Sequence, residues 1–446
     1  MEIAYRGEVL RFSPTWILAT NRSFRRILDR FLKQRNTSDA DFTAYGSLRA
    51  FSARQFLLSG DDEAVATELF RGAPLVSPSP TIGEDRADDL AQGIAQWMLD
   101  NLSNEGELPY KYWPSRGMVS PADNAIRQFL ASLSLARLGE LRSNAEIREA
   151  ARRNLRFNLK RYFRNIGEGR GAIVERTGAK LGAAALAALA ILESPASAEF
   201  LPELEMLAAG VNSLADKDRG FRTFFFPPER DGDNWNFYSG EALLFWAEAM
   251  RRGARYAPTL EQCVSTFACC RRRHYQARNP AFVPWHTQAC ASLFNRTGRR
   301  EFAGFVLEAN DWLLSMQQWD RPKGLPPDLW GRFYDPQRPE FGPPHAASTG
   351  AYLEGLADAM TLAREIGDEA RAAAYERAIA RGLRSLRQLQ FRSQHDAFYV
   401  SRRERVMGAL RTEAYDNAVR IDSAAHALAA SVKILQHGLQ PRGGNT

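Results

Sequence analysis

The sequence predicts an all-α fold, an (α/α)6 toroid in which six outer helices cover a ring of six inner helices, with a small N-terminal α+β extension. From residue 84 onward, amphipathic, charged helical patterns alternate with apolar ones rich in small residues. The pairs recur at a spacing of about 50–60 residues, which is typical of a repeat architecture. Six pairs favour a closed ring over the alternative, an open helical solenoid.

The first part of the chain differs in pattern from the rest, and we expect the extension at 1–80 and the toroid at 81–446. Proline and serine between residues 74 and 80 indicate a linker there. Within the extension, the pattern predicts a short hairpin followed by two helices, at residues 7–12, 16–19, 23–33 and 47–58. Its function cannot be read from these residues.

The outer member of each later pair carries charges along one face, and the inner member is apolar on nearly all sides. A helix that is apolar all round is a buried helix. The predicted outer helices are 85–102, 143–163, 198–214, 258–276, 298–317 and 368–390. The predicted inner helices are 121–138, 178–193, 239–252, 285–296, 347–366 and 418–436.

Connections from an outer helix to its inner helix are long, and the return connections are short. In an alternating ring, all the long connections lie at one face, and long loops on a rigid scaffold usually carry function. These connections are rich in aromatic rings, whose flat faces suit the C–H patches of sugars. We select five rings as a stacking platform: Tyr112, Trp113, Trp235, Tyr238 and Trp285. The alternative is that the loops pack on one another through these rings.

Composition limits the function classes. The net charge is +7, and the 59 basic residues are 7 lysines and 52 arginines, which indicates either a G+C-rich genome or an anionic partner. No apolar run is long enough to span a bilayer and no signal peptide is evident, so a cytoplasmic protein is expected. The four cysteines have neither disulfide nor zinc spacing. We expect no metal, no cofactor and no nucleic-acid module, and the oligomeric state is not readable.

Six helix pairs with an aromatic funnel resemble the six-hairpin glycosidase-like superfamily, over about residues 85–436. That group includes many glycoside hydrolases, some polysaccharide lyases and the N-acylglucosamine 2-epimerases. The resemblance implies a carbohydrate site at the N-terminal mouth of the inner helices.

Carboxylates at those positions suggest hydrolysis, which needs one protonated and one ionised carboxyl group. Glu241 lies early in a buried helix, where a carboxylate needs a partner, and Glu354 is placed similarly. Asp233 lies on the preceding loop. Asp123 opens the first inner helix, where an N-cap is the alternative role. These four are the candidate acids and bases of a glycosidase.

Two histidines suggest a different chemistry. His286 and His426 fall on the fourth and sixth inner helices, and this placement resembles the acid/base pair of the N-acylglucosamine 2-epimerases. The Pro-Trp-His at His286 is similar to their Pro-Gly-His, although no acidic residue follows it here. Such a pair would move a proton beside a sugar carbonyl. A hydrogen-bonded core histidine is the alternative for His426, with Arg420 and Asp422 either orienting its ring or binding substrate.

The leading hypothesis is therefore an enzyme that acts on carbohydrate, most simply a glycoside hydrolase working on an anionic or polar glycan. The first alternative is a sugar epimerase or isomerase that uses His286 and His426. The second is a non-catalytic toroid that binds a glycan, a peptide or a protein partner.

Overall fold

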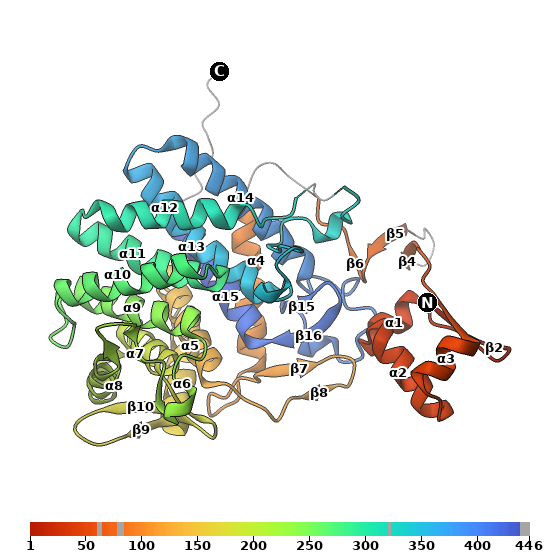
Figure 1. Cartoon of the computed structure of the whole chain (residues 1–446), viewed down its shortest axis with the longest axis horizontal. Helices are drawn as coiled ribbons and strands as arrows, with labels where there is room; N and C mark the ends of the chain where they lie inside the picture. Colours follow the sequence, from red (N-terminus) through yellow and green to blue (C-terminus); the bar gives the residue numbers. More distant parts are fainter. Residues whose placement is uncertain (60–64, 78–83, 320–322, 438–446) are drawn as a thin grey trace.

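The computed structural model of the chain describes residues 1–59, 65–77, 84–319 and 323–437, and in these ranges the helices form a closed ring (Figure 1). Each inner helix packs on the next, and the last packs on the first, α15 on α5. The predicted toroid is confirmed, and an open solenoid is excluded. The inner helices are α5 (Ala125–Leu141), α7 (Leu181–Glu193), α9 (Trp235–Arg251), α11 (Val283–Thr297), α13 (Ala346–Glu365) and α15 (Ile421–His437).

The outer helices each cover the inner helix of the adjacent position, as α6 covers α5 and α4 covers α15. They are α4 (Glu84–Asn101), α6 (Ala145–Tyr162), α8 (Leu201–Ser213), α10 (Leu260–Gln276), α12 (Arg300–Leu314) and α14 (Glu369–Leu389). Side-chain caps fix several starts, because Thr259 and Asp368 accept hydrogen bonds from the first-turn amides of α10 and α14.

Small residues allow the inner helices to approach closely. Every residue of α7 from Leu181 to Leu192 is buried. Gly350 of α13 lies against α15, and a Cβ there would be 2.8 Å from the carbonyl carbon of His426. The side chains of α13 and α15 at this level are therefore held in contact. Within the described ranges, no helix is both long and apolar enough to cross a bilayer.

The long connections contain short strands that stiffen one rim of the ring. Two four-stranded sheets form there, in the orders β14-β11-β10-β9 and β15-β16-β7-β8. The second sheet pairs Tyr112 with Val419, so it joins the first and the last helix pairs. The strands are β7 (Lys111–Trp113), β8 (Met118–Val119), β9 (Phe163–Asn165), β10 (Gly171–Glu175), β11 (Gly178–Lys180), β12 (Ala215–Asp216), β13 (Gly220–Phe221), β14 (Phe224–Phe226), β15 (Arg411–Glu413) and β16 (Asp416–Arg420).

The N-terminal part, red in Figure 1, has a small hydrophobic core of its own around Ile3, Ile27 and Phe31. It consists of β1 (Glu2–Tyr5), β2 (Glu8–Arg11), α1 (Pro14–Thr20), α2 (Phe24–Arg35), α3 (Asp39–Tyr45), β3 (Gly46–Arg49), β4 (Gln55–Ser59), β5 (Val65–Phe70) and β6 (Ala73–Pro74). This is an α+β arrangement, as predicted. The expected boundary at residue 80 and residues 78–80 of the expected linker lie outside the described residues.

Two local predictions in this part are wrong. The predicted helix at 47–58 is instead β3 and β4, because β3 pairs with β1, a partner distant in sequence that local pattern does not reveal. The hairpin forms between β1 and β2, and Trp16 lies in α1. The side chain of Ser13 caps α1 and Pro14 occupies its first turn, which is a helix-start signal. The helix predicted at 23–33 is confirmed as α2.

The N-terminal part is fastened to the ring by polar contacts. Asn21, at the end of α1, donates to the Asp416 carboxylate at 2.7 Å, and the Asn417 side chain donates to the carbonyl of Leu18 at 2.8 Å. Arg71 forms an ion pair with Asp328, which belongs to the long connection between α12 and α13. The extension is thus held against the β15–β16 hairpin.

Candidate functional site

A cavity of about 400 Å³ opens where the inner helices begin. All six inner helices contribute to its wall, as the predicted gathering of the long connections at one rim requires. Its lining includes the charged and titratable side chains Arg127, Lys180, Arg230, Tyr238, Glu241, Tyr334, Asp335, His345, Arg420, Asp422 and His426.

Glu241 lies in the first half of α9 and is only 3% exposed. Burial raises the pKa of its carboxyl group to about 8, against the opposing effect of the Lys180 ammonium. Its Oε2 atom has no hydrogen-bond partner among the described residues. The group is therefore protonated at neutral pH, the state that a general acid requires.

Lys180 lies at the N-terminus of α7 and was not selected from the sequence. Its ammonium pairs with Glu175, whose other oxygen accepts the backbone N–H of Ala125 at 3.0 Å. This pair connects the starts of α5 and α7 and places a positive charge beside Glu241. A lysine immediately before an apolar inner helix was the available signal.

His426 of α15 lines the cavity and contacts Glu354 of α13. Its Nδ1 atom is 2.7 Å from Oε1 of Glu354, which is 1% exposed. A carboxylate that accepts from Nδ1–H fixes the ring and its tautomer, and leaves Nε2 as the proton acceptor. No described residue forms a hydrogen bond with Nε2. Glu354 itself does not line the cavity, so it acts through the histidine.

Asp422 is held between two arginines on the same side of the cavity. Arg127 Nε is 2.9 Å from its Oδ2 and Arg420 Nε is 3.0 Å from its Oδ1, which also accepts the N–H of Ser423. Although burial raises the pKa of Asp422, the two guanidinium groups hold it below its ordinary value. One carboxylate faces two cations, so this cluster carries excess positive charge.

His345 caps α13 and was also not selected from the sequence. Its Nδ1 accepts the N–H of Ser348 at 3.0 Å, which places the ring proton on Nε2. Burial lowers its pKa to about 4, so the ring is neutral at physiological pH. It therefore offers the cavity a neutral N–H donor.

Two predicted carboxylates lie outside the cavity lining. Asp233 is half-exposed and pairs with Arg230 at 3.0 Å. Asp123 accepts hydrogen bonds from the Tyr162 hydroxyl and the Gln128 amide. The cap of α5 is Asn124, so Asp123 does not have the alternative role of N-cap. The structure brings neither residue to Glu241.

His286 is fully buried behind the cavity wall. Its ring stacks on Phe282 at 3.4 Å between centroids, and its nitrogens face the Phe282 carbonyl at 2.8 Å and the Ser239 hydroxyl at 3.3 Å. Burial lowers its pKa to about 3. Of the two predicted histidines, only His426 lines the cavity.

Of the five predicted aromatic rings, some line the cavity and others do not. Tyr238 and Trp285 line the cavity. Trp235 is buried against Phe282, Tyr112 is buried in β7, and Trp113 lies beside Lys111 and Arg116. Five lining rings were not selected: Phe237, Phe333, Tyr334, Phe341 and Tyr352. Within the described residues, no group of three or more His, Cys, Asp or Glu side chains is arranged to hold a metal ion.

The absence of a side chain at Gly182 leaves space for the carboxyl group of Glu241. A Cβ at this position would lie 2.0 Å from Glu241 Oε2 and 2.5 Å from the Tyr238 ring. We expect Gly182→Ala to lower the free energy of unfolding by about 1–3 kcal/mol through overpacking. Gly304→Ala is the control, because nothing lies within 4 Å of its Cβ position on α12 and alanine favours a helix. Urea unfolding measures both, and equal stability of the two variants would contradict this packing.

The chain resembles several solved structures in fold, although not in sequence. No protein-family model and no curated protein matches the sequence. A D-mannose isomerase matches with a TM-score of 0.58 and 12% identity, covering 81% of this chain and 100% of that one. An unsaturated glucuronyl hydrolase specific for heparin matches with a TM-score of 0.56 and 11% identity, covering 79% and 98%.

A third match is the α-1,6-mannanase GH76A of Salegentibacter sp. HEL1_6 in complex with α-1,6-mannotriose, with a TM-score of 0.55 and 10% identity, covering 80% of this chain and 99% of that one. At such identities the likeness concerns the fold. The chain therefore shares the (α/α)6 toroid fold of these three proteins.

Proposed function

We propose that this protein is a carbohydrate-active enzyme that moves a proton at a sugar carbon next to a carbonyl group, as an isomerase or epimerase does. In this proposal His426 is the base and Glu241 the acid. The similarity in fold to a mannose isomerase, a glucuronyl hydrolase and a mannanase supports the substrate class.

The single observation that carries the proposal is the His426–Glu354 pair, whose histidine lines the same cavity as Glu241. α9 and α15 are separated by two inner helices in either direction around the ring, so the two side chains project from opposite sides. Nε2 of His426 would take a proton from the carbon while Glu241 gives its proton to the carbonyl oxygen, forming an enediol. His426 then delivers the proton to the neighbouring carbon while Glu241 takes the proton of the other enediol hydroxyl, which yields the isomer and restores both groups; epimerisation would require a further proton donor on the opposite face.

Charge in the cavity favours an anionic sugar. Lys180 and Arg230 are paired with Glu175 and Asp233, whereas Arg127 and Arg420 share the single carboxylate of Asp422 and leave one positive charge in excess. Arginine forks suit carboxylate and phosphate groups. A uronate or a sugar phosphate is therefore the preferred substrate class.

Hydrolysis of a glycosidic bond is the second candidate, and the protonated state of Glu241 favours it. In that reaction Glu241 would protonate the leaving oxygen, and Asp335 of the cavity wall would activate water. The arginine-held Asp422 is a weaker base, because both guanidinium groups stabilise its ionised form.

Incubation in D₂O with a panel of uronates and sugar phosphates tests the proposal. We expect deuterium at the carbon next to the carbonyl, detected by NMR, with the epimer or ketose as product. New reducing ends from a polysaccharide panel, without deuterium in carbon, would replace the isomerase with the hydrolase. Ligand-induced thermal stabilisation without either reaction would identify a binding protein and overturn the enzyme assignment.

A further inference from the structure

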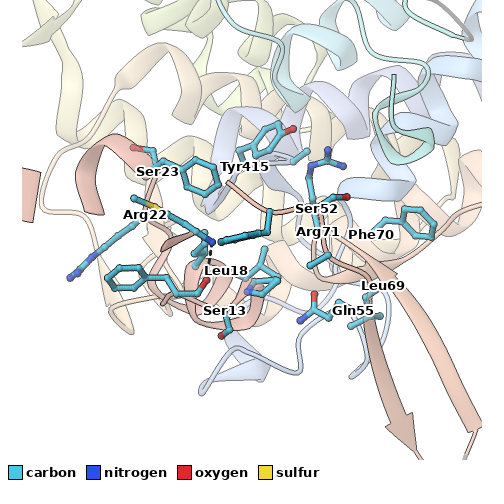
Figure 2. Close-up of a pocket in the computed structure, with 18 of the residues that line it drawn as sticks. Ser13, Leu18, Arg22, Ser23, Ser52, Gln55, Leu69, Phe70, Arg71 and Tyr415 are labelled. Atoms are coloured by element: carbon cyan, nitrogen blue, oxygen red, sulfur yellow. Dashed lines mark hydrogen bonds between the residues drawn. The ribbon is translucent and has the colours of Figure 1, made fainter. Parts of the chain in front are cut away.

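A second cavity, of about 1130 Å³, lies outside the ring, at the junction between the N-terminal part and the toroid (Figure 2). It is larger than the cavity inside the ring. We call it the junction cavity; its wall comes from α1, the start of α2, β5, the residues before β4 and the β15–β16 turn. Figure 2 shows Tyr415 of that turn across from Leu18 of α1.

The wall of the junction cavity is mostly apolar. Phe12, Ile17, Leu18 and Leu69 contribute to it, and three further rings at its edge stay accessible to solvent. Phe24, Phe51 and Tyr415 are 45%, 59% and 63% exposed. A contiguous exposed apolar surface of this kind is typical of a binding site.

Most polar side chains in this wall already form hydrogen bonds within the protein. Ser13 caps α1, and Gln55 donates to the Thr15 hydroxyl at 2.7 Å. Asn21 and Asn417 hold α1 to the β15–β16 hairpin. Glycans and extended peptides bring many donors and acceptors that would lack partners here, at a cost in free energy. A hydrocarbon chain brings none.

The wall of the junction cavity also carries positive charge that no carboxylate in the described part of the chain neutralises. Arg11, Arg54 and Arg71 of the wall have carboxylate partners in Glu2, Glu68 and Asp328. Arg411 and Arg22 differ, because none of the described carboxylates forms an ion pair with either of them.

Arg411 is 3% exposed, and its guanidinium donates to the carbonyls of Arg71 at 2.6 Å and Gln388 at 2.9 Å. Those carbonyls satisfy hydrogen bonds but do not neutralise the charge. A buried cation without a counter-charge is costly, and an anionic group of a ligand would neutralise it.

We propose that the junction cavity binds a free, single-chain anionic amphiphile, a fatty-acid-like molecule. Its hydrocarbon chain would lie between Leu18, Phe51 and Tyr415, and its carboxylate or phosphate head would lie beside Arg411. This site is separate from the catalytic cavity and does not depend on the reaction proposed there.

Calorimetric titration of the full chain with decanoate, decanol and acetate tests the proposal. Decanoate binds, acetate does not, and decanol binds at least about tenfold more weakly because it lacks the charge. Equal affinity for decanol and decanoate would remove the anionic head from the proposal. Co-sedimentation with phosphatidylglycerol vesicles without binding of decanoate would replace the free amphiphile by a membrane surface, and no binding of any probe would overturn the site.

Phe51→Asp places a carboxylate in the cavity wall and weakens decanoate binding by at least about tenfold, because it removes an apolar ring and repels the head group. Phe56→Asp is the matched control: Phe56 is 49% exposed on nearby β4 but does not line the cavity. Equal weakening by both variants would contradict the assignment. Both changes are at exposed positions, and thermal unfolding verifies that the fold is intact.

Discussion

Replacing His426 by alanine lowers turnover by about 10²–10⁴-fold, the usual contribution of a positioned acid or base. The His426–Glu354 pair supplies the proton acceptor of the proposed reaction, and alanine removes it without adding a new group to the cavity. The rate of deuterium incorporation into the sugar in D₂O measures the loss. The apparent affinity for substrate changes much less than the turnover number, because the arginines of the cavity remain.

His437→Ala is the matched control, because His437 lies on the same helix but faces Asp358 at 3.4 Å instead of the cavity. It leaves turnover unchanged. Glu354→Gln tests positioning: it keeps the shape of the partner but removes the charge that stabilises the protonated ring. The ring is then deprotonated more easily, so the acidic limb of the pH–rate profile shifts toward lower pH. Full turnover in His426→Ala would exclude this histidine as the base.

The contribution of Glu241 to the unfolding free energy falls as pH rises from 4.5 to about 8. Below pH 6.5 buried histidines oppose it, so the fall is the net trend from pH 6.5 to about 8. The Glu241 carboxyl group retains a proton over this range when folded, whereas the unfolded chain loses that proton near 4.5. The folded state then binds more protons than the unfolded state, and its stability declines by up to about 1.4 kcal/mol per pH unit. Urea unfolding across this range measures the slope.

Glu241→Gln removes this decline, because the amide does not titrate. The variant still loses stability below pH 6.5. There the unfolded chain protonates His286 and His345, whereas burial lowers the pKa of both rings and keeps them neutral in the folded state. Glu229→Gln changes an exposed carboxylate and serves as the control. An identical slope in wild type and Glu241→Gln would show that the buried carboxyl group is ionised at neutral pH.

The helical ring was predictable because its signal is local. Helix periodicity, small residues on the inner members and the asymmetry of loop lengths are all present within each pair. The strands of the N-terminal part were less accessible, because β3 depends on pairing with β1 across more than forty positions of the chain. Local pattern does not contain such partners.

The sequence predicts that the candidate site lies at the starts of the inner helices. It does not predict which side chains of each helix point into the cavity. Successive residues on an α-helix differ by about 100° in direction. Trp285 therefore lines the cavity while its neighbour His286 is buried against Phe282 and Ser239. Glu241, Asp422 and His426 had the right phase, whereas no local pattern indicates the contact of His426 with Glu354 on the neighbouring helix α13.

The pairing of β7 with β16 has a consequence for how the chain folds. These strands lie some three hundred residues apart, yet they unite the opening and final hairpins of the ring. β16 can pair with β7 only after the helices between them have been made, so we expect no stable half-ring in which hairpins accumulate one after another. Unfolding is accordingly expected to be concerted, and loss of the final hairpin by proteolysis would expose the interior of every preceding one.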